Sequence, residues 1–247
     1  MSDAGYVPYF IALVFALAGF VKGVIGLGLP TIAVGLLTLS MAPAEAAALL
    51  LIPSLVTNLQ QSAGPHFGAL LKRLWPMFIG IAAGTWIGAG LLTGGSAAIA
   101  ATGLGAALIV YAAIGLLAVR FRVAPRTEPW LAAPIGAATG VVTGATGVFV
   151  IPAVPYLQAL GLDRHALVQA LGLSFTVSTV ALGVVLQRAG LFDLTMAGSS
   201  MLALVPALLG MGLGQWLRRR ISEHVFRRCF FLGLLALGIH LAVRAVL

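Results

Sequence analysis

The chain has 247 residues, of which 61% are hydrophobic and only 8% charged, and it carries a formal net charge of +8 with a mean hydropathy of +1.10. Because a soluble globular domain is roughly one quarter charged, this composition excludes a soluble fold and predicts a membrane protein whose surface mostly faces lipid. The basic residues occupy short loops between apolar segments, which the positive-inside rule explains better than binding to nucleic acid.

Ten apolar segments follow one another along the chain, and each is long enough, or nearly so, to cross a hydrocarbon core of about 30 Å. They are 6–21, 24–40, 44–61, 75–93, 97–119, 131–143, 147–161, 165–187, 194–217 and 225–245. The first, second, sixth and seventh are short, and each of these two pairs flanks a glycine-rich break. The polar loops are 62–74, 120–130 and 218–228. The sequence therefore predicts an all-α polytopic membrane protein without a soluble domain.

The first break is the stretch Lys22-Gly23-Val24-Ile25-Gly26-Leu27-Gly28-Leu29-Pro30. Proline suits the first turn of a helix, so a new half-helix is expected to begin near Leu29, with its free N–H groups and positive dipole end directed at the tip of the break. A similar glycine-rich stretch, Thr139–Gly147, interrupts the second half. Such breaks at corresponding places in two halves are typical of the binding site of a transporter.

The two halves resemble each other, which predicts a first transmembrane repeat at 1–122, a cytoplasmic linker at 123–130 and a second repeat at 131–247. Each repeat would consist of a glycine-broken pair of short helices followed by three full transmembrane helices. The matched positions are Gly19 and Gly23 with Gly136 and Gly140, Ser54 and Asn58 with Ser174 and Ser178, and Gly84 and Gly88 with Gly210 and Gly214.

The distribution of charge favours one orientation of the two halves. If each broken pair enters and leaves on one side of the membrane, eleven basic residues share one face, and only Arg188 and Arg244 lie opposite, with Lys22 inside the membrane. The eleven are Lys72, Arg73, Arg120, Arg122, Arg126, Arg164, Arg218, Arg219, Arg220, Arg227 and Arg228. If each pair instead crosses once, the split is seven against six. The first arrangement, with inverted repeats, a cytoplasmic basic face and both chain ends outside, is therefore expected.

Lys22 stands alone between two apolar stretches. A charge at the centre of a bilayer costs about 2.5–3.5 kcal/mol even on lenient scales, and such residues are usually functional. The alternative is that Lys22 lies near an interface and extends its amino group to water. The glycines have a similar alternative, which is close packing of helices without a ligand. We expect the tip of the break to bind an anion through Lys22 and backbone N–H groups.

Ser54, Thr57, Asn58 and Gln61 lie on one helical face, and Ser174 and Ser178 would form a partner stripe. Such stripes either line a polar cavity or only hold helices together. The candidate substrate-binding residues are Lys22, Gly23, Gly26, Gly28, Thr31, Ser54, Thr57, Asn58, Gln61, Thr139, Gly140, Thr143, Gly144, Thr146, Ser174 and Ser178. No catalytic residues, metal site or cofactor are predicted, because neither metal-ligand spacing nor a nucleophile motif occurs.

The stretch 19–30, the segment Ala44-Glu45-Ala46 followed by a helix with Asn58, and the second break at 140–147 resemble the TauE/SafE family of sulfite and organosulfonate exporters. The resemblance extends over essentially the whole chain and implies about eight spans. The chain differs from the common family pattern at Leu29-Pro30, and at Thr143 and Thr146, so the tip is expected to be shaped for a different ligand from that of the named exporters.

The expected function is that of a permease in the bacterial inner membrane that exports sulfite or an organosulfonate by alternating access. The expected partners are a small anionic substrate and the lipid bilayer, with no nucleic acid, and a homo-oligomer is left open. Uptake of another small anion, such as thiosulfate or a carboxylate, remains an alternative, as does a membrane subunit that transports nothing. An intramembrane enzyme is a second class of function, and a channel or accessory subunit a third; a flux assay separates these classes, since an enzyme or a scaffold would move no anion.

Overall fold

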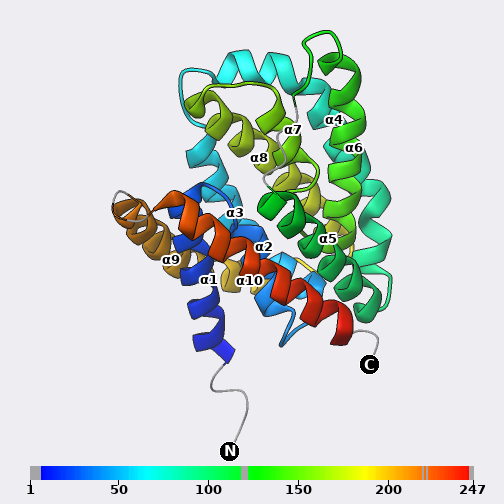
Figure 1. Cartoon of the computed structure of the whole chain (residues 1–247). Helices are drawn as coiled ribbons and strands as arrows, with labels where there is room; N and C mark the ends of the chain where they lie inside the picture. The colour runs from blue at the N-terminus through cyan, green and yellow to red at the C-terminus, as the bar shows by residue number, and fades with distance from the viewer. Residues whose placement is uncertain (1–6, 118–121, 219, 221, 245–247) are drawn as a thin grey trace, which may run out of the picture.

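The computed structural model describes residues 7–117, 122–218, 220 and 222–244, and throughout these ranges the regular structure is helical (Figure 1). The helices are α1 (Val7–Ile25), α2 (Leu29–Leu37), α3 (Pro43–Ser62), α4 (Phe67–Thr93), α5 (Ala97–Leu117), α6 (Glu128–Thr146), α7 (Ala153–Ala159), α8 (Arg164–Arg188), α9 (Leu194–Leu217) and α10 (Glu223–Arg244). Six of them, α1, α4, α5, α8, α9 and α10, are long and apolar enough to cross a membrane. The predicted all-α membrane class is confirmed. Arg120 and Arg219 of the predicted basic face lie outside the described residues.

The first break begins later than the sequence predicts. Helix α1 continues through Lys22 and Gly23 to Ile25, and the chain leaves the helix at Gly26, whose φ is 77°. The half-helix α2 starts at Leu29, where the sequence predicts it, with Pro30 in its first turn. Lys22 is therefore a helical residue in the last turn of α1 rather than part of the irregular tip.

The second break was predicted in the wrong place. Helix α6 runs without interruption through Thr139, Gly140, Thr143 and Gly144, and the chain leaves it at Gly147, whose φ is 74°. The irregular stretch is 148–152, and only the seven-residue helix α7 follows it. The glycines of α6 allow close contact with α4 and do not interrupt the helix. An added Cβ at Gly140 would lie 2.2 Å from the carbonyl oxygen of Ile81.

Two further boundaries differ from prediction. The first member of each broken pair is not short, because α1 and α6 have 19 residues each. Most of the predicted loop 62–74 is helical, because α4 begins at Phe67 and buries Leu70 and Leu74 while Lys72 and Arg73 stay exposed. Figure 1 shows this first part of α4 lying across the top of the molecule before the helix turns downward. Pro76 lies inside α4, where it removes a backbone hydrogen bond and bends the helix.

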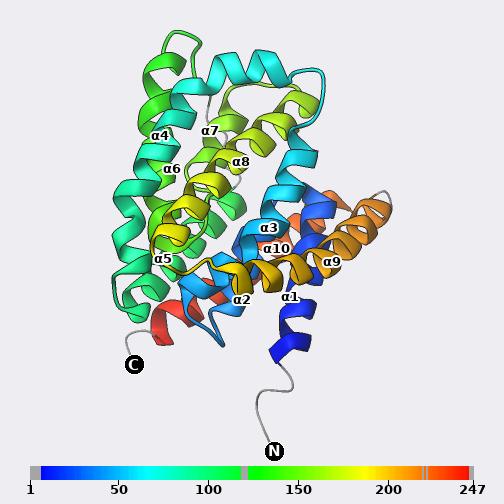
Figure 2. The same ribbon diagram turned by 180° about the vertical axis from the view of Figure 1, so that it is seen from behind.

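The two halves of the chain interlock. Helix α1 packs on α9, α4 on α6, α3 on α8 and α5 on α10, so each pair joins a helix before the linker to one after it (Figures 1 and 2). Glycines allow several of these contacts, since an added Cβ at Gly19 would lie 2.0 Å from the carbonyl oxygen of Ala207. One apolar core, which includes Phe15, Phe149 and Phe175, extends across both halves.

Candidate functional site

Lys22 is buried at the contact between α1 and α3, with 5% of its surface exposed. Its Nζ donates a hydrogen bond of 2.9 Å to the Thr57 hydroxyl and another to the Asn58 side-chain oxygen. The geometry explains why Lys22 does not extend to water: α3 holds its amino group inside the protein. The structure thus brings Lys22 into contact with two residues of the stripe on α3.

The stripe continues into α8 through the amide of Asn58. Asn58 Nδ2 donates to Ser54 Oγ at 3.0 Å and to Thr179 Oγ1 at 3.3 Å. Ser54, Thr57 and Asn58 are each no more than 1% exposed. The cluster of Lys22, Ser54, Thr57, Asn58 and Thr179 thus connects one helix of the second half to two of the first. We refer to these five residues as the lysine cluster.

The lysine cluster contains no carboxylate. The ion pair formed within the described residues joins Arg73 to Glu128, and none of the described acidic side chains pairs with Lys22. The hydroxyl groups of Thr57 and Thr179 also donate to backbone carbonyl groups of their own helices at 2.7 Å. When protonated, Lys22 has only neutral acceptors, and an anion would supply the missing counter-charge.

Gln61 joins α3 to the first break, because its Nε2 donates to the carbonyl oxygen of Gly26 at 3.2 Å while its Oε1 is buried without a partner. At the start of α2, Gly28 has φ 108° and provides no side-chain cap, and Thr31 donates to the Gly28 carbonyl oxygen at 3.0 Å. Gly23 instead allows close helix packing, since an added Cβ would lie 2.3 Å from the carbonyl oxygen of Met211.

Ser174 and Ser178 are fully buried, and their hydroxyl groups have no hydrogen-bond partner within the part of the chain that the structure describes. The hydrogen bond from α8 to the stripe on α3 is made by Thr179 instead. The sequence analysis missed Thr179, which is the next residue after Ser178. Which of two adjacent residues contacts α3 depends on the register of α8 against α3, and the sequence does not give that register.

The candidate residues on α6 are engaged in its own structure. Thr139, Thr143 and Thr146 donate to backbone carbonyl groups one turn earlier, at 2.8, 2.7 and 2.7 Å. Gly140 and Gly144 face the backbone of α4, as an added Cβ at Gly144 would lie 2.3 Å from the carbonyl oxygen of Thr85. These five residues are therefore not joined to the lysine cluster.

A cavity of about 1010 Å³ opens beside the first break. Residues of the predicted basic loops surround it together with hydrophobic residues of the break, α5 and α10. Its lining includes Ile25, Leu27, Tyr111, Arg122, Arg164, Leu171, Arg218, His224, Arg227, Arg228 and Phe231. We call this cavity the basic vestibule.

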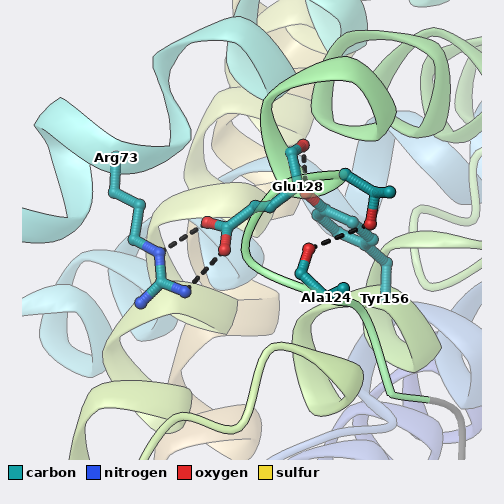
Figure 3. A network of polar contacts seen from close by, with 5 residues as sticks. Arg73, Ala124, Glu128 and Tyr156 are labelled. Carbon is teal, nitrogen blue, oxygen red and sulfur yellow. Dashed lines mark hydrogen bonds and ion pairs between the residues drawn. The ribbon is translucent and has the colours of Figure 1, made fainter.

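A polar network fixes the linker beside the basic vestibule (Figure 3). Arg73 of α4 donates two hydrogen bonds, of 2.5 and 2.7 Å, to the carboxylate of Glu128. The Tyr156 hydroxyl donates to the Glu128 carbonyl oxygen at 3.3 Å, and the linker amide of Val123 donates to the Ala159 carbonyl oxygen at 3.0 Å. The linker is thus held against α4 and α7, and the neighbouring Arg122 is positioned at the vestibule.

A family model described as "Sulfite exporter TauE/SafE" aligns with residues 11–241 of the chain. The match covers all ten helices except a few terminal residues of α1 and α10. No curated protein and no solved structure matches the chain.

Proposed function

The chain belongs to the TauE/SafE sulfite exporter family, and on that premise we propose that it is a membrane permease for a small oxyanion, which exports sulfite or an organosulfonate by alternating access. One observation carries the choice of an anion. Lys22 is buried among neutral partners from α3, where a protonated amine lacks a counter-ion.

We infer that the lysine cluster is the binding site. The start of α2, with its uncapped first turn at Gly28 and Leu29, follows Lys22 closely along the chain and adds the positive end of a helix dipole. Gln61 holds the break against α3 at Gly26. An oxyanion between Lys22 and the tip would meet a cation and several neutral donors together.

Alternating access requires two parts that move against each other, and we infer that these are inverted repeats. The glycine contacts support this inference because the contacts between α1 and α9 repeat those between α6 and α4. Gly19 on α1 faces Ala207, three residues before Gly210 on α9. In the other half, Gly140 on α6 faces Ile81, which lies three residues before Gly84 on α4 in the same way.

This register differs by one helical turn from the sequence match, which paired Gly19 with Gly136. The contacts of Gly23 and Gly144 support the new register, since they face Met211 and Thr85, each one residue beyond the matched glycine of the partner helix. In this register, Lys22 corresponds to Thr143. The second half therefore has no lysine at the equivalent position, and we expect one anion site at the lysine cluster rather than two symmetric sites.

The direction of α3 and α8 supports inversion. Along α3, Leu51 lies near Gly183, Asn58 bonds to Thr179, and Ser62 lies near Gly172, so the two helices run antiparallel. A twofold axis that exchanges antiparallel helices is perpendicular to both. If both helices cross the membrane, that axis lies in the membrane plane, as inverted repeats require.

Export fits the energetics of an anion. Moving one negative charge out of an inside-negative cell gains about 2.3 kcal/mol per 100 mV. Such a permease needs no coupling ion, and the lysine cluster includes no carboxylate that would bind a proton or a sodium ion.

The test is flux in proteoliposomes that contain the purified protein. Sulfite, taurine, thiosulfate and small carboxylates are supplied in turn, with the Lys22→Met protein as the matched control. We expect sulfite or a sulfonate to move in the wild-type vesicles and not in the control vesicles. Flux of a carboxylate alone would mean that the substrate is a carboxylate and not sulfite or a sulfonate. Absence of any flux would favour a subunit that transports nothing.

A further inference from the structure

We propose that the basic vestibule is a second anion site, which takes small oxyanions from the aqueous phase before they reach the lysine cluster. This inference rests on the proposed function for the role of the site in transport, although its binding can be measured independently.

The charge of the basic vestibule supports an anionic occupant. Arg122 comes from the linker, Arg164 from the start of α8, and Arg227 and Arg228 from the start of α10, so segments far apart in the chain place guanidinium groups around one cavity of about 1010 Å³. No described carboxylate lines it. The nearby Asp163 is occupied as the cap of α8, where the backbone N–H of Ala166 holds its pKa below the ordinary value.

The inner wall of the basic vestibule offers a donor. Tyr111 lines the cavity and is 2% exposed, and its hydroxyl group has no hydrogen-bond partner among the described residues. Phe231 contacts the Tyr111 ring edge-on at 5.2 Å, and Arg227 lies over the Phe231 ring at 5.8 Å. A column of Arg227, Phe231 and Tyr111 thus runs from the exposed rim to the buried wall. An oxyanion there would satisfy the hydroxyl and the guanidinium groups together.

Two helices connect the basic vestibule to the interior. On α1, Ile25 lines the cavity and Lys22 lies one turn deeper. On α8, Leu171 lines the cavity, and Ser174 and Ser178 continue along the same helical face with hydroxyl groups that lack partners. On α8, two unpartnered hydroxyl groups therefore lie along the helix between the cavity-lining Leu171 and Thr179 of the lysine cluster, and on α1 one helical turn separates Ile25 from Lys22.

Equilibrium binding of sulfite, measured by calorimetry on the purified protein, tests this inference. We expect two binding events in the wild-type protein. The Lys22→Met protein should keep one event, which weakens at least tenfold between 50 and 300 mM potassium gluconate, because exposed arginines are screened by salt. The double variant Arg227→Gln/Arg228→Gln should keep the other, salt-insensitive event. Absence of binding to the Lys22→Met protein would overturn the vestibule site and leave the lysine cluster intact.

A matched variant separates a site from the general surface charge. Arg126→Gln/Arg220→Gln removes the same charge from exposed positions that do not line the cavity. We expect it to bind sulfite as the wild type does, and Tyr111→Phe to weaken the salt-sensitive event severalfold. Equal losses in both double variants would show that only surface potential acts, which would overturn the inference.

The same chemistry could come from a phospholipid headgroup, so binding is repeated in nanodiscs of phosphatidylcholine with and without phosphatidylglycerol. A site for free oxyanions keeps both events in either lipid. If phosphatidylglycerol abolishes the salt-sensitive event alone, the occupant is a lipid headgroup and the inference is wrong.

Discussion

Lys22 is a buried amine whose partners, Thr57 and Asn58, are both neutral. An uncompensated buried charge costs several kcal/mol, and a bound oxyanion removes much of that cost. We therefore predict that sulfite at 100 times its dissociation constant stabilises the wild-type protein by about 2.7 kcal/mol. The Lys22→Met protein should gain no stabilisation from sulfite at this site. Thermal unfolding of both proteins is measured with increasing sulfite to compare their stabilisation. The measurement is made at high ionic strength, because salt screens the arginines of the basic vestibule.

Lys22→Arg provides the matched control for charge. Arginine keeps the positive charge, but its fork is larger and directs its hydrogen bonds differently, so we expect sulfite-dependent stabilisation well below that of the wild type. Full stabilisation of the Lys22→Met protein would show that Lys22 is structural and that the anion binds elsewhere.

Asn58 allows a second test of the anion site, because it contacts the amino group of Lys22. The Asn58 side-chain oxygen accepts from Lys22, so Asn58→Asp places a carboxylate where a neutral acceptor now lies. The new carboxylate would act as an internal counter-ion. We predict that the Asn58→Asp protein folds with at least wild-type thermal stability and loses sulfite transport more than tenfold in the flux assay. Wild-type flux in this variant would contradict an anion site at Lys22.

Much of the lysine cluster could be predicted from sequence, because a lone lysine in apolar sequence and a polar stripe at helical spacing are local patterns. Thr57 and Asn58 are identified by that spacing. Thr179 is not, because the register of α8 against α3 depends on tertiary packing. The α6 candidates show a second limit, since Thr143 and Thr146 use their hydroxyl groups within their own helix.

At the scale of helices, glycines determine how closely α4 and α6 pack. An added Cβ at Gly84 would lie 2.1 Å from the carbonyl oxygen of Ala137, whereas at Gly90, on the same helix, it would meet nothing within 4 Å. We predict that Gly84→Ala destabilises the protein by about 1–3 kcal/mol through overpacking. Gly90→Ala should be neutral or stabilising by up to about 1 kcal/mol, since alanine favours helix.

Thermal unfolding of the two purified variants in detergent, followed by tryptophan fluorescence, measures this contrast. Similar midpoints for both variants would mean that α4 and α6 separate at little cost, and that their close contact does not hold the halves together.

The ten helices could be predicted in order, because their apolar length is a strong signal, but one break was misplaced. Glycines in apolar sequence have two uses, which are to end a helix and to let another helix approach. In the first break, Gly26 and Gly28 both have positive φ: Gly26 ends α1, and Gly28 precedes the start of α2. In α6, Gly140 and Gly144 instead contact α4, and only Gly147 ends the helix. Composition does not distinguish these uses, because the difference depends on the partner helix.

At the scale of the molecule, the position of the basic vestibule bears on topology. Arg122 from the linker and Arg227 from α10 line the same cavity, so the linker and the start of α10 lie at the same end of the molecule. Arg188, at the end of α8, instead lies over the Trp86 ring at 4.9 Å, away from this cavity. An arrangement in which each broken pair crosses once would put the linker and the start of α10 on opposite sides of the membrane, which a shared cavity disfavours.

The native Cys229 allows a direct test of the topology. It is exposed on α10, next to Arg228 of the basic vestibule, and is the only cysteine in the chain. Because arginine-rich loops stay in the cytoplasm, we predict that a membrane-impermeant maleimide labels Cys229 in inverted vesicles and not in intact spheroplasts. In a Cys229→Ser background, Arg126→Cys should label from the cytoplasm and Ala189→Cys only from outside. If Cys229 and the cysteine at position 126 label from opposite sides, each broken pair crosses the membrane once, and the inverted-repeat mechanism has to be abandoned.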